Sequence, residues 1–186
     1  LPDQHGAIRL YDHTQPRLLS TKGHAYLKVA EGCNNPCTFC HIPAMRGKYR
    51  SRRLGALVAD ARRLESAGVK ELILIAQDTT DYGHDLGLKN GLAVLLERMV
   101  KMLKGGASAE RTGEDEVKWI RIMYAYPGYV TDRLIDVMAS QEKILPYLDI
   151  PLQHADPGVL RQMRRPANIE WVYKSLVKMR EKMPDL

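Results

Sequence analysis

The sequence predicts an α/β protein built from parallel β/α repeats, with about four strands. Short apolar runs alternate with segments whose apolar residues recur every three or four positions, as they do on the buried face of a helix. The run at 71–76 has no polar face, which is typical of a strand buried on both sides in a parallel sheet. Alternation of this kind implies right-handed crossovers, so the sheet is either open or curled toward a barrel.

The composition is that of a globular protein: 45% of the 186 residues are hydrophobic and 27% are charged. No apolar run approaches the roughly 20 residues that span a bilayer, and no signal peptide is recognisable, so we expect a cytoplasmic protein that does not bind membranes. The net charge of +6 suits a negatively charged partner, such as RNA or a ribosome, without specifying one. We expect the polar, weakly patterned residues 1–20 to be a linker from a preceding domain.

The first half of the chain contains two predicted strands. Residues 25–30 form a short strand that leads into a loop with all the cysteines, followed by a basic stretch at 46–53. Apolar residues with helical spacing predict a helix over 54–64, and Gly68 is placed to cap its C-terminus. The apolar run at 71–76 is the second strand.

The second half repeats the alternation. Thr131 is a suitable N-cap for the helix after the third strand, and Asp156 with the proline that follows it opens a short helix. Pro151 has no N–H for a ladder hydrogen bond and is the weak point of the fourth strand. The longer elements are predicted to be a helix over 92–103, a hydrophilic loop over 105–118, a strand over 119–124, a helix with its apolar face at 134–138, a strand over 147–152 and a helix from about 169 to 183.

Each predicted strand ends in polar or ligand-like residues. The cysteine loop follows the first strand, Gln77 and Asp78 follow the second, residues 124–126 follow the third, and Gln153 and His154 follow the fourth. Because the C-terminal ends of parallel strands lie at one edge of a sheet, these residues should face the same side. The sequence therefore predicts an active site at that edge.

The three cysteines lie within eight residues, as Cys33-x3-Cys37-x2-Cys40. An odd and clustered set does not suit a disulfide framework and favours a metal site in a reducing compartment. Three thiolates on one centre leave a coordination position for a group that is not a cysteine. Such tight spacing in a proline-containing loop is hard to justify by packing alone.

Three kinds of centre are considered. Residues 37–41 match the Cys-x-x-Cys-His signature of a c-type haem, but this leaves Cys33 unexplained and no export signal is present. A structural zinc ion could use the cysteines and His41, although adjacent ligands at 40 and 41 have difficulty pointing at one ion. A [4Fe–4S] cluster held by three cysteines keeps one iron free for a substrate or cofactor.

The cysteine spacing at the exit of the first strand resembles the radical S-adenosylmethionine (SAM) superfamily, whose free iron chelates the amino and carboxylate groups of SAM. Longer strings resemble the methylthiotransferases, and in particular the branch that modifies an aspartate of a ribosomal protein. The tRNA-modifying relatives tend to carry Gln-Asn where this chain has Gln77-Asp78. The strings that carry the resemblance are Glu31-Gly-Cys-Asn, Cys37-Thr-Phe-Cys, Arg46-Gly47, Ala76-Gln-Asp-Thr, Tyr124-Ala-Tyr-Pro and residues 146–155.

The resemblance implies that residues 21–186 are the N-terminal two-thirds of a (β/α)6 radical SAM barrel. It implies that an electron from a [4Fe–4S] cluster cleaves SAM, and that the resulting radical leads to methylthiolation of an aspartate Cβ in the twelfth small-subunit ribosomal protein. A donor such as flavodoxin or ferredoxin would supply the electron. A second [4Fe–4S] cluster is expected in an N-terminal domain, so the chain should not complete the reaction alone.

The resemblance also implies roles for individual residues, and no catalytic residue is assigned beyond the cluster ligands. Cys33, Cys37 and Cys40 would ligate the cluster. Phe39 would lie beside the adenine, Gln77 and Asp78 would contact the methionine amino group, and Gln153 would contact the ribose or methionine part. Arg46, Tyr124 and Tyr126 are candidate SAM or substrate contacts. We interpret His154 as a structural histidine and the three arginines Arg161, Arg164 and Arg165 as generic surface charge.

Two other functions stay open from the sequence. A tRNA methylthiotransferase of the same superfamily is the alternative within the enzymes. A zinc-stabilised nucleic-acid-binding module is the alternative outside them, suggested by the net charge and the basic stretch after His41. Such a module would bind RNA in a salt-sensitive way and would not need SAM.

Overall fold

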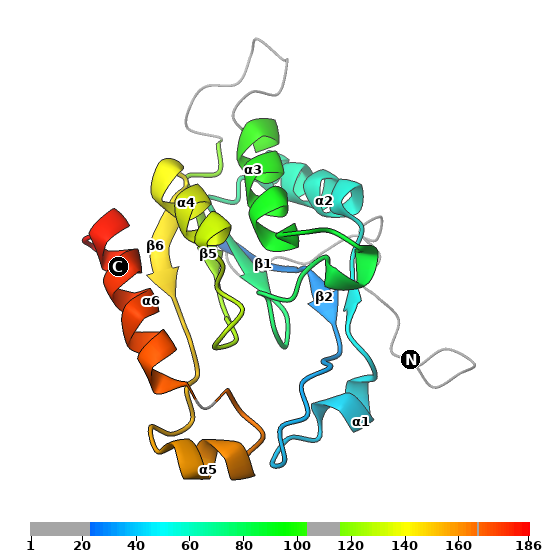
Figure 1. Ribbon diagram of the computed structural model, residues 1–186. Coiled ribbons are helices and arrows are strands. Elements are labelled where there is room, and N and C mark those ends of the chain that lie inside the picture. Colours follow the sequence, from blue (N-terminus) through cyan, green and yellow to red (C-terminus); the bar gives the residue numbers. More distant parts are fainter. Residues whose placement is uncertain (1–22, 104–115, 167) are drawn as a thin grey trace.

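The computed structural model describes residues 23–103, 116–166 and 168–186. Each strand of its main sheet pairs with the next one along the chain, as in a barrel, whereas a doubly wound sheet reverses its order. The predicted α/β class with four parallel strands is therefore confirmed, and the arrangement is consistent with a partial barrel. The four strands lie side by side in chain order (Figure 1): β1 (His24–Lys28), β4 (Glu71–Ile75), β5 (Trp119–Ile122) and β6 (Ile144–Leu148).

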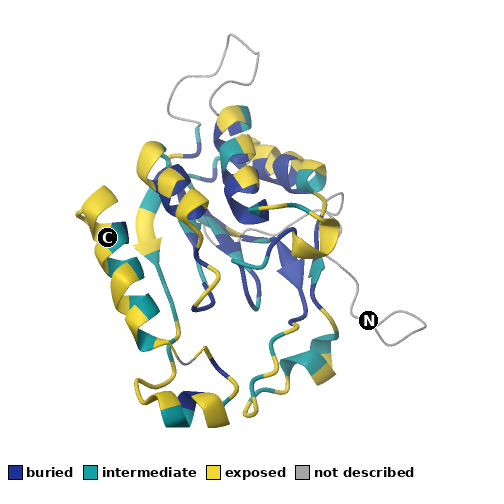
Figure 2. Ribbon diagram, in the orientation of Figure 1, coloured by how far each residue is buried: buried dark blue, intermediate teal, exposed yellow. Residues whose placement is uncertain are grey.

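Helices between the strands cover one face of this sheet, and the buried segments gather between the two layers (Figure 2). The connecting helices are α2 (Leu54–Ser66), α3 (Gly91–Leu103) and α4 (Asp132–Ser140). A further helix, α6 (Ile169–Lys182), comes after β6 and α5 in the chain and packs on α4. There Lys178 forms an ion pair with Asp132 at 2.6 Å. Among the described residues, no helix is both long and apolar enough to cross a membrane.

The central strand β4 is buried on one side only. Leu72 and Leu74 are fully buried in the core beneath the helices. Ile73 between them is partly exposed, and its neighbour on β1, Tyr26, is 55% exposed. The expectation that this apolar run is covered on both faces is therefore wrong for the described part of the chain, because the helices pack on one face and leave the opposite face accessible.

The first predicted strand, 25–30, is divided in the structure. β1 ends at Lys28, and the next two residues form β2 (Ala30–Glu31), which pairs antiparallel with β3 (Arg50–Ser51). This small second sheet lies outside the main one and brings the end of the basic stretch beside the start of the cysteine loop. Strands of two residues are too short to leave an alternating pattern, so the sequence did not predict them.

The fourth strand lies earlier than predicted, at β6 (Ile144–Leu148) and not at 147–152. The strand ends at Leu148, and the next residue, Asp149, bonds to the exit of β5: its carbonyl accepts from the Ala125 N–H over 3.0 Å, and its Oδ1 accepts from the Tyr124 N–H over 2.6 Å. Pro146 lies inside β6, where a proline is tolerated because the strand is at the edge of the described sheet.

The predicted helix ends are confirmed. Thr131 Oγ1 accepts from the Leu134 N–H at the start of α4, and the side chain of Asp156 caps α5 (Pro157–Gln162). Gly68 follows α2 with a left-handed φ of 84°. Two short helices, α1 (Ile42–Arg46) and the 3-10 turn η1 (His84–Leu86), were not predicted. The expected linker at 1–20 and most of the expected loop at 105–118 lie outside the described residues.

Candidate active site at the cysteine loop

The cysteine loop (residues 31–41) connects β2 to α1 at the end of the sheet toward which the strands point, together with α5 (Figure 1). Gly32 begins the loop with φ of 78°, and a Cβ there would lie 2.3 Å from the Lys48 carbonyl oxygen. The following Cys33 N–H donates to the Gly47 carbonyl over 3.2 Å. The start of the loop is therefore held against residues 47 and 48 by a close approach that only glycine permits.

Cys33 is the buried thiol of the three, with an exposed fraction of 9%. Its Sγ accepts a hydrogen bond of 3.4 Å from the Asn35 N–H. Burial raises the pKa of the Cys33 thiol, and the hydrogen bond from Asn35 opposes this shift. The backbone thus supplies a donor that favours a negatively charged sulfur at this position.

Cys37 lies between two side chains that come from distant elements. The Tyr126 hydroxyl is 3.8 Å from Cys37 Sγ, and Arg165 Nη1 donates to the same sulfur over 3.8 Å. Burial is the main cause that raises the pKa of Tyr126, so this side chain is a neutral phenol at physiological pH. With an exposed fraction of 8%, Tyr126 is a buried neighbour of the Cys37 thiol.

Asn35 joins the cysteine loop to the exit of β4. Its Nδ2 donates to Asp78 Oδ2 over 2.9 Å, while Asp78 Oδ1 accepts from the Thr80 hydroxyl over 2.7 Å. The Asp78 carbonyl also accepts from the Tyr49 hydroxyl over 2.8 Å. Burial raises the pKa of Asp78, against the opposing effect of its hydrogen bonds. With an exposed fraction of 1%, the Asp78 carboxylate supports the loop and does not face an open pocket.

Gln77, directly after β4, differs from its neighbour. Its Oε1 atom is buried and has no hydrogen-bond partner among the described residues. A buried acceptor without a donor is costly, so a ligand with N–H groups would stabilise this position. Gln77 thus fits a ligand-binding role better than Asp78 does.

Backbone strain marks the exits of β5 and β6. Tyr124 and Gln153 have φ of 61° and 74°, in the left-handed region that residues other than glycine rarely adopt. The Tyr126 N–H donates to Thr80 Oγ1 over 3.0 Å, and the Thr79 N–H donates to the Tyr124 carbonyl over 3.0 Å. These contacts connect the exits of β4 and β5, as the sequence predicted from the order of the strands.

The side chains at the rim of the site are accessible. Phe39 is 52% exposed and Tyr124 is 47% exposed, and Gln153 is also exposed. His154 is exposed as well, and its Nδ1 accepts from the Asp156 N–H over 2.9 Å, in keeping with a local structural role. The predicted site residues thus fall into three groups: Cys33, Asp78 and Tyr126 are buried, Phe39, Tyr124 and Gln153 are exposed, and Cys37, Cys40, Gln77 and Arg46 are partly exposed.

Arg46 has a partner that the sequence did not suggest. Its Nη1 lies 3.0 Å from Glu31 Oε1, and Lys28 Nζ lies 2.7 Å from the other carboxylate oxygen. Burial would raise the pKa of Glu31, but the hydrogen bonds from Lys28 and Arg46 outweigh it, so the pKa is lowered. The basic stretch also contains a buried residue: Arg52 is buried and pairs with Asp60 at 3.2 Å.

The interpretation of Arg161, Arg164 and Arg165 as generic surface charge is wrong for Arg165, which is 8% exposed and contacts Cys37 and Tyr126. Asn35 and Tyr49 were also missed as supports of the loop. The contacts of Asn35 and Tyr49 with Asp78 span 43 and 29 positions, and the contact of Arg165 with Cys37 spans 128, so no local pattern could have identified them.

A donor set of three free thiols suits a [4Fe–4S] cluster. Within residues 23–103, 116–166 and 168–186, no three His, Cys, Asp or Glu side chains lie together as the ligands of one metal ion would. Cys33, Cys37 and Cys40 are free thiols, and a [4Fe–4S] cluster takes each cysteine on a different iron. Donors from Asn35 and Arg165 already point at two of the sulfurs, as outer partners of metal-bound thiolates do.

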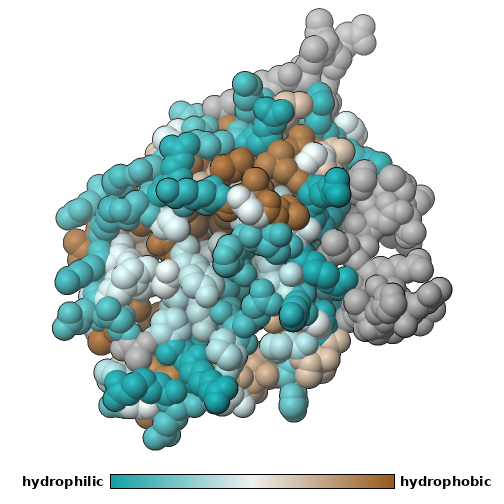
Figure 3. Space-filling view, turned by 45° about the vertical axis from the view of Figure 1, so that its right-hand side comes forward, coloured by the Kyte–Doolittle hydropathy of each residue, from teal (hydrophilic) through white to brown (hydrophobic). Residues whose placement is uncertain are grey.

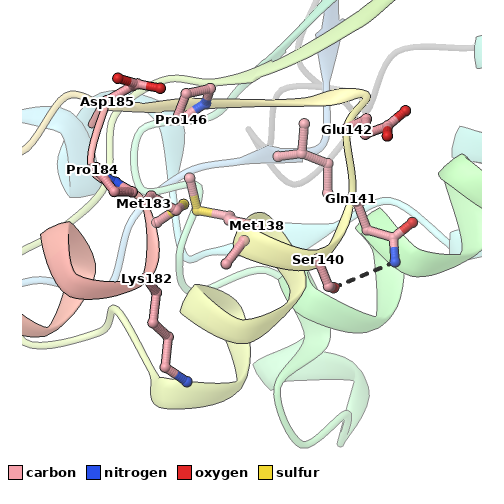
Figure 4. A pocket seen from close by; sticks show the side chains of 11 residues that line it. Met138, Ser140, Gln141, Glu142, Pro146, Lys182, Met183, Pro184 and Asp185 are labelled. Carbon is pink, nitrogen blue, oxygen red and sulfur yellow. Dashed lines mark hydrogen bonds between the residues drawn. The ribbon is translucent and has the colours of Figure 1, made fainter.

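A pocket of about 440 Å³ lies elsewhere, between the end of α4, β6 and the end of α6 (Figure 4). Met138, Met183 and Pro146 contribute to its lining, and none of the predicted site residues does. The space-filling view shows a mostly hydrophilic surface with hydrophobic side chains gathered in one area (Figure 3). The pocket therefore lies apart from the candidate active site.

Comparison with known sequences identifies close relatives. The ribosomal protein uS12 methylthiotransferase RimO of Koribacter versatilis (strain Ellin345) is 50% identical over 178 residues, which is 95% of this chain and 33% of that protein. RimO of Symbiobacterium thermophilum is 48% identical over 171 residues, which is 91% of this chain and 33% of that protein. The chain thus spans about a third of the length of the curated relatives it matches.

Comparison with solved structures supports the fold. The radical SAM methyltransferase TsrM from Kitasatospora setae, with tryptophan and a SAM analogue bound, matches 87% of this chain and 29% of that chain with a TM-score of 0.62. At 16% identity this similarity concerns the fold alone. The sequence model of the radical SAM superfamily matches residues 27–185, which include the end of β1, the cysteine loop and the other three strands of the main sheet. The chain belongs to the radical SAM superfamily.

Proposed function

We propose that this chain is the SAM-binding core of a transferase that adds a methylthio group to an aspartate of ribosomal protein uS12. The observation that carries the proposal is the cysteine loop, in which Cys33, Cys37 and Cys40 are free thiols held at the exits of parallel strands. The two relatives at 48% and 50% identity, both named uS12 methylthiotransferases, support this reaction and this substrate.

The cofactors of the proposed site are a [4Fe–4S] cluster and SAM. When bound and reduced, the cluster supplies the electron that cleaves SAM. The chain's own residues hold and shield it: Cys33 is buried, the Asn35 N–H donates to its sulfur, and the Tyr126 hydroxyl lies 3.8 Å from Cys37 Sγ. Support for this assignment comes from the three free thiols and from the membership of the superfamily.

Gln77 is the residue best placed to bind the SAM ammonium group. Its buried Oε1 has no donor in the described part of the chain, and an ammonium group offers three N–H donors. Asp78 positions Asn35 and the loop, so its contribution to SAM binding is indirect. Phe39 and Gln153 are exposed and free to contact the adenosine part, and Tyr124 borders the same edge.

Further parts of the reaction are proposed from the relatives, of which this chain covers about a third. A preceding domain with a second [4Fe–4S] cluster would join through residues 1–20, and 21–186 would form the N-terminal two-thirds of the barrel. A flavodoxin or ferredoxin would donate the electron. The aspartate substrate would be presented by the small ribosomal subunit in the cytoplasm, and Arg46 would need to leave Glu31 to contact it.

Anaerobic reconstitution of the chain with iron and sulfide tests the cofactor assignment. We expect a brown protein that converts SAM to 5′-deoxyadenosine with dithionite, and loss of both properties when Cys33, Cys37 or Cys40 is replaced by Ala. The His41→Ala variant is the matched control and should keep both properties, because His41 is a ligand only in the zinc and haem alternatives. A colourless protein that binds only zinc would refute the proposal.

Mass spectrometry of a strain that lacks the parent gene tests the substrate. We expect the methylthio group to disappear from uS12 and the tRNA modifications to persist. Complementation with the full-length gene should restore the mass of uS12, whereas a gene with Cys37→Ala should not. Loss of a tRNA methylthio group with unchanged uS12 would instead identify the tRNA-modifying class.

A further inference from the structure

Arg165 is a buried cation whose described partners include no carboxylate. It is 8% exposed, its Nη2 donates to the Pro151 carbonyl, and its Nε is buried without a partner. The other buried arginine, Arg52, pairs with Asp60 at 3.2 Å. A buried positive charge is costly unless a negative group lies beside it, and Cys37 Sγ, 3.8 Å from Nη1, is the one candidate that Arg165 contacts in the described residues.

The end of α5 places Arg165 with a defined backbone motif. The Arg165 N–H donates to the Leu160 carbonyl over 2.9 Å, and the Arg164 N–H donates to the Arg161 carbonyl over 3.0 Å. These two hydrogen bonds and the left-handed φ of 51° at Arg164 form a Schellman motif. The motif turns the chain back, so that the residue after the left-handed position faces the cysteine loop.

The turn at the end of α5 is hydrogen-bonded directly to the cysteine loop. The Thr38 N–H donates to the Met163 carbonyl over 3.1 Å, and Thr38 Oγ1 donates to the Gln162 carbonyl over 3.2 Å. Thr38 is the residue after Cys37, so the turn and the thiol are held in register. The Arg165 guanidinium thereby has a fixed position beside one cysteine.

Tyr126 completes the surroundings of this sulfur. The Arg165 guanidinium lies 4.2 Å from the centroid of the Tyr126 ring, in a cation–π contact, and the Tyr126 hydroxyl lies 3.8 Å from Cys37 Sγ. One sulfur therefore has a positive charge and a hydroxyl donor within reach. Cys33 differs from Cys37 in this respect, because the donor to its sulfur is the backbone N–H of Asn35.

We propose that Arg165 and Tyr126 set the reduction potential of the cluster that Cys37 holds, by donating to its sulfur and placing a positive charge beside it. One-electron reduction of the cluster by an external donor adds negative charge. Hydrogen bonds to the sulfur atoms and a nearby positive charge favour that change, which raises the potential. The inference rests on the proposed function in one respect, because it requires the cluster to be bound by the three cysteines.

A redox titration of the anaerobically reconstituted chain tests the inference. The cluster is reduced stepwise with dithionite in the absence of SAM, and the reduced state is measured by electron paramagnetic resonance, together with iron and sulfide content. We expect a more negative midpoint potential for Arg165→Gln, an intermediate value for Arg165→Lys and a smaller negative shift for Tyr126→Phe. Arg161→Gln removes an exposed charge from the same helix and should keep the wild-type potential.

Unchanged potentials in Arg165→Gln and Tyr126→Phe, at wild-type iron content, would overturn the inference and leave the proposed function intact. If Arg165→Gln does not hold a cluster, Arg165→Lys and Tyr126→Phe decide the question in the same way. A wild-type chain that takes up no iron–sulfur cluster would instead refute the proposed function itself. A shift of equal size in Arg161→Gln would also overturn the inference, because it would show a general effect of charge.

Discussion

The Asn35 side-chain amide donates a hydrogen bond of 2.9 Å to Asp78 Oδ2, across 43 positions of the sequence. This contact fixes the middle of the cysteine loop to the exit of β4. It also accounts for an acidic residue at a position with an exposed fraction of only 1%, because the carboxylate is surrounded by donors. The loop geometry therefore depends on a residue that does not ligate a metal.

Replacing Asn35 with Ala should lower the free energy of unfolding by about 1–3 kcal/mol, because one buried carboxylate oxygen loses its donor. Asn35→Asp should cost more, since it places a second carboxylate against Asp78. Urea unfolding of the metal-free chain measures both values. Equal stability of the wild type and Asn35→Ala would show that the hydrogen bond does not hold the loop.

The pH dependence of stability should report on Asp78. Its folded pKa is raised by burial, so the folded state holds the proton more tightly than the unfolded state does. Stability from this group is present below the unfolded pKa of about 4 and is lost as the pH rises through the folded pKa. As the pH rises over that interval, we expect the unfolding free energy of the wild type to fall relative to that of Asp78→Asn, which does not titrate there. A difference that is independent of pH would contradict the raised pKa.

Two glycines with similar backbone angles should respond differently to alanine. Gly32 and Gly47 have φ of 78° and 76°, but only a Cβ at Gly32 would meet backbone atoms, at 2.3 Å from the Lys48 oxygen. Gly47→Ala should cost about 1–3 kcal/mol from its backbone conformation alone, because φ of 76° with ψ of −168° is a combination that essentially only glycine adopts. Gly32→Ala should cost roughly 3 kcal/mol or more and reduce the iron content after reconstitution. Similar losses in both variants would contradict the close approach.

Replacing Arg46 separates a structural role from a role in SAM binding. Arg46→Ala leaves Glu31 with Lys28 as its remaining ion-pair partner in the described residues and should cost about 1 kcal/mol in urea unfolding, since Arg46 is partly exposed. Its SAM affinity, measured by calorimetry on the reconstituted chain, should stay at the wild-type value. A clear loss of affinity with unchanged stability would return Arg46 to the SAM site.

Arg164 offers a stabilising change. It occupies the left-handed position of the Schellman motif with φ of 51°, where glycine is the residue usually found. Arg164→Gly should raise the free energy of unfolding by about 1 kcal/mol, because the strain of an L side chain is relieved. The cluster potential should not change, since Arg165 keeps its place. A lower stability would show that the Arg164 side chain makes contacts that outweigh the strain.

Elements with a strong periodic pattern were predictable. The helices α2, α3, α4 and α6 and the strands β4 and β5 lie where apolar spacing placed them. The prediction of β6 at 147–152 was wrong because local pattern does not show that Asp149 binds the backbone of Tyr124. The buried-on-both-sides interpretation of β4 was wrong for a related reason: an apolar strand in a partial barrel has one face away from the helices.

The candidate site was predictable as a place and less so as a mechanism. The spacing of the cysteines and the parallel order of strands identified the loop and the edge of the sheet. Among the described residues, the Gln77 side-chain oxygen has no donor, whereas the Asp78 carboxylate has three. This difference depends on the directions of the two side chains, which the sequence does not show. The burial of Arg165 depends on a turn that returns to the loop over 128 positions.

The long sequence separation of the Cys37 contacts has a consequence for the order of assembly. Cys33 obtains its partners from residues 35 and 47, which leave the ribosome soon after it. Cys37 meets Tyr126 and Arg165 only 89 and 128 positions later. Closing such long loops is slow compared with local contacts. During synthesis the cysteine loop is therefore complete long before Tyr126 and Arg165 are available to contact Cys37. The turn after α5 must pack against the loop before a cluster can have its final surroundings.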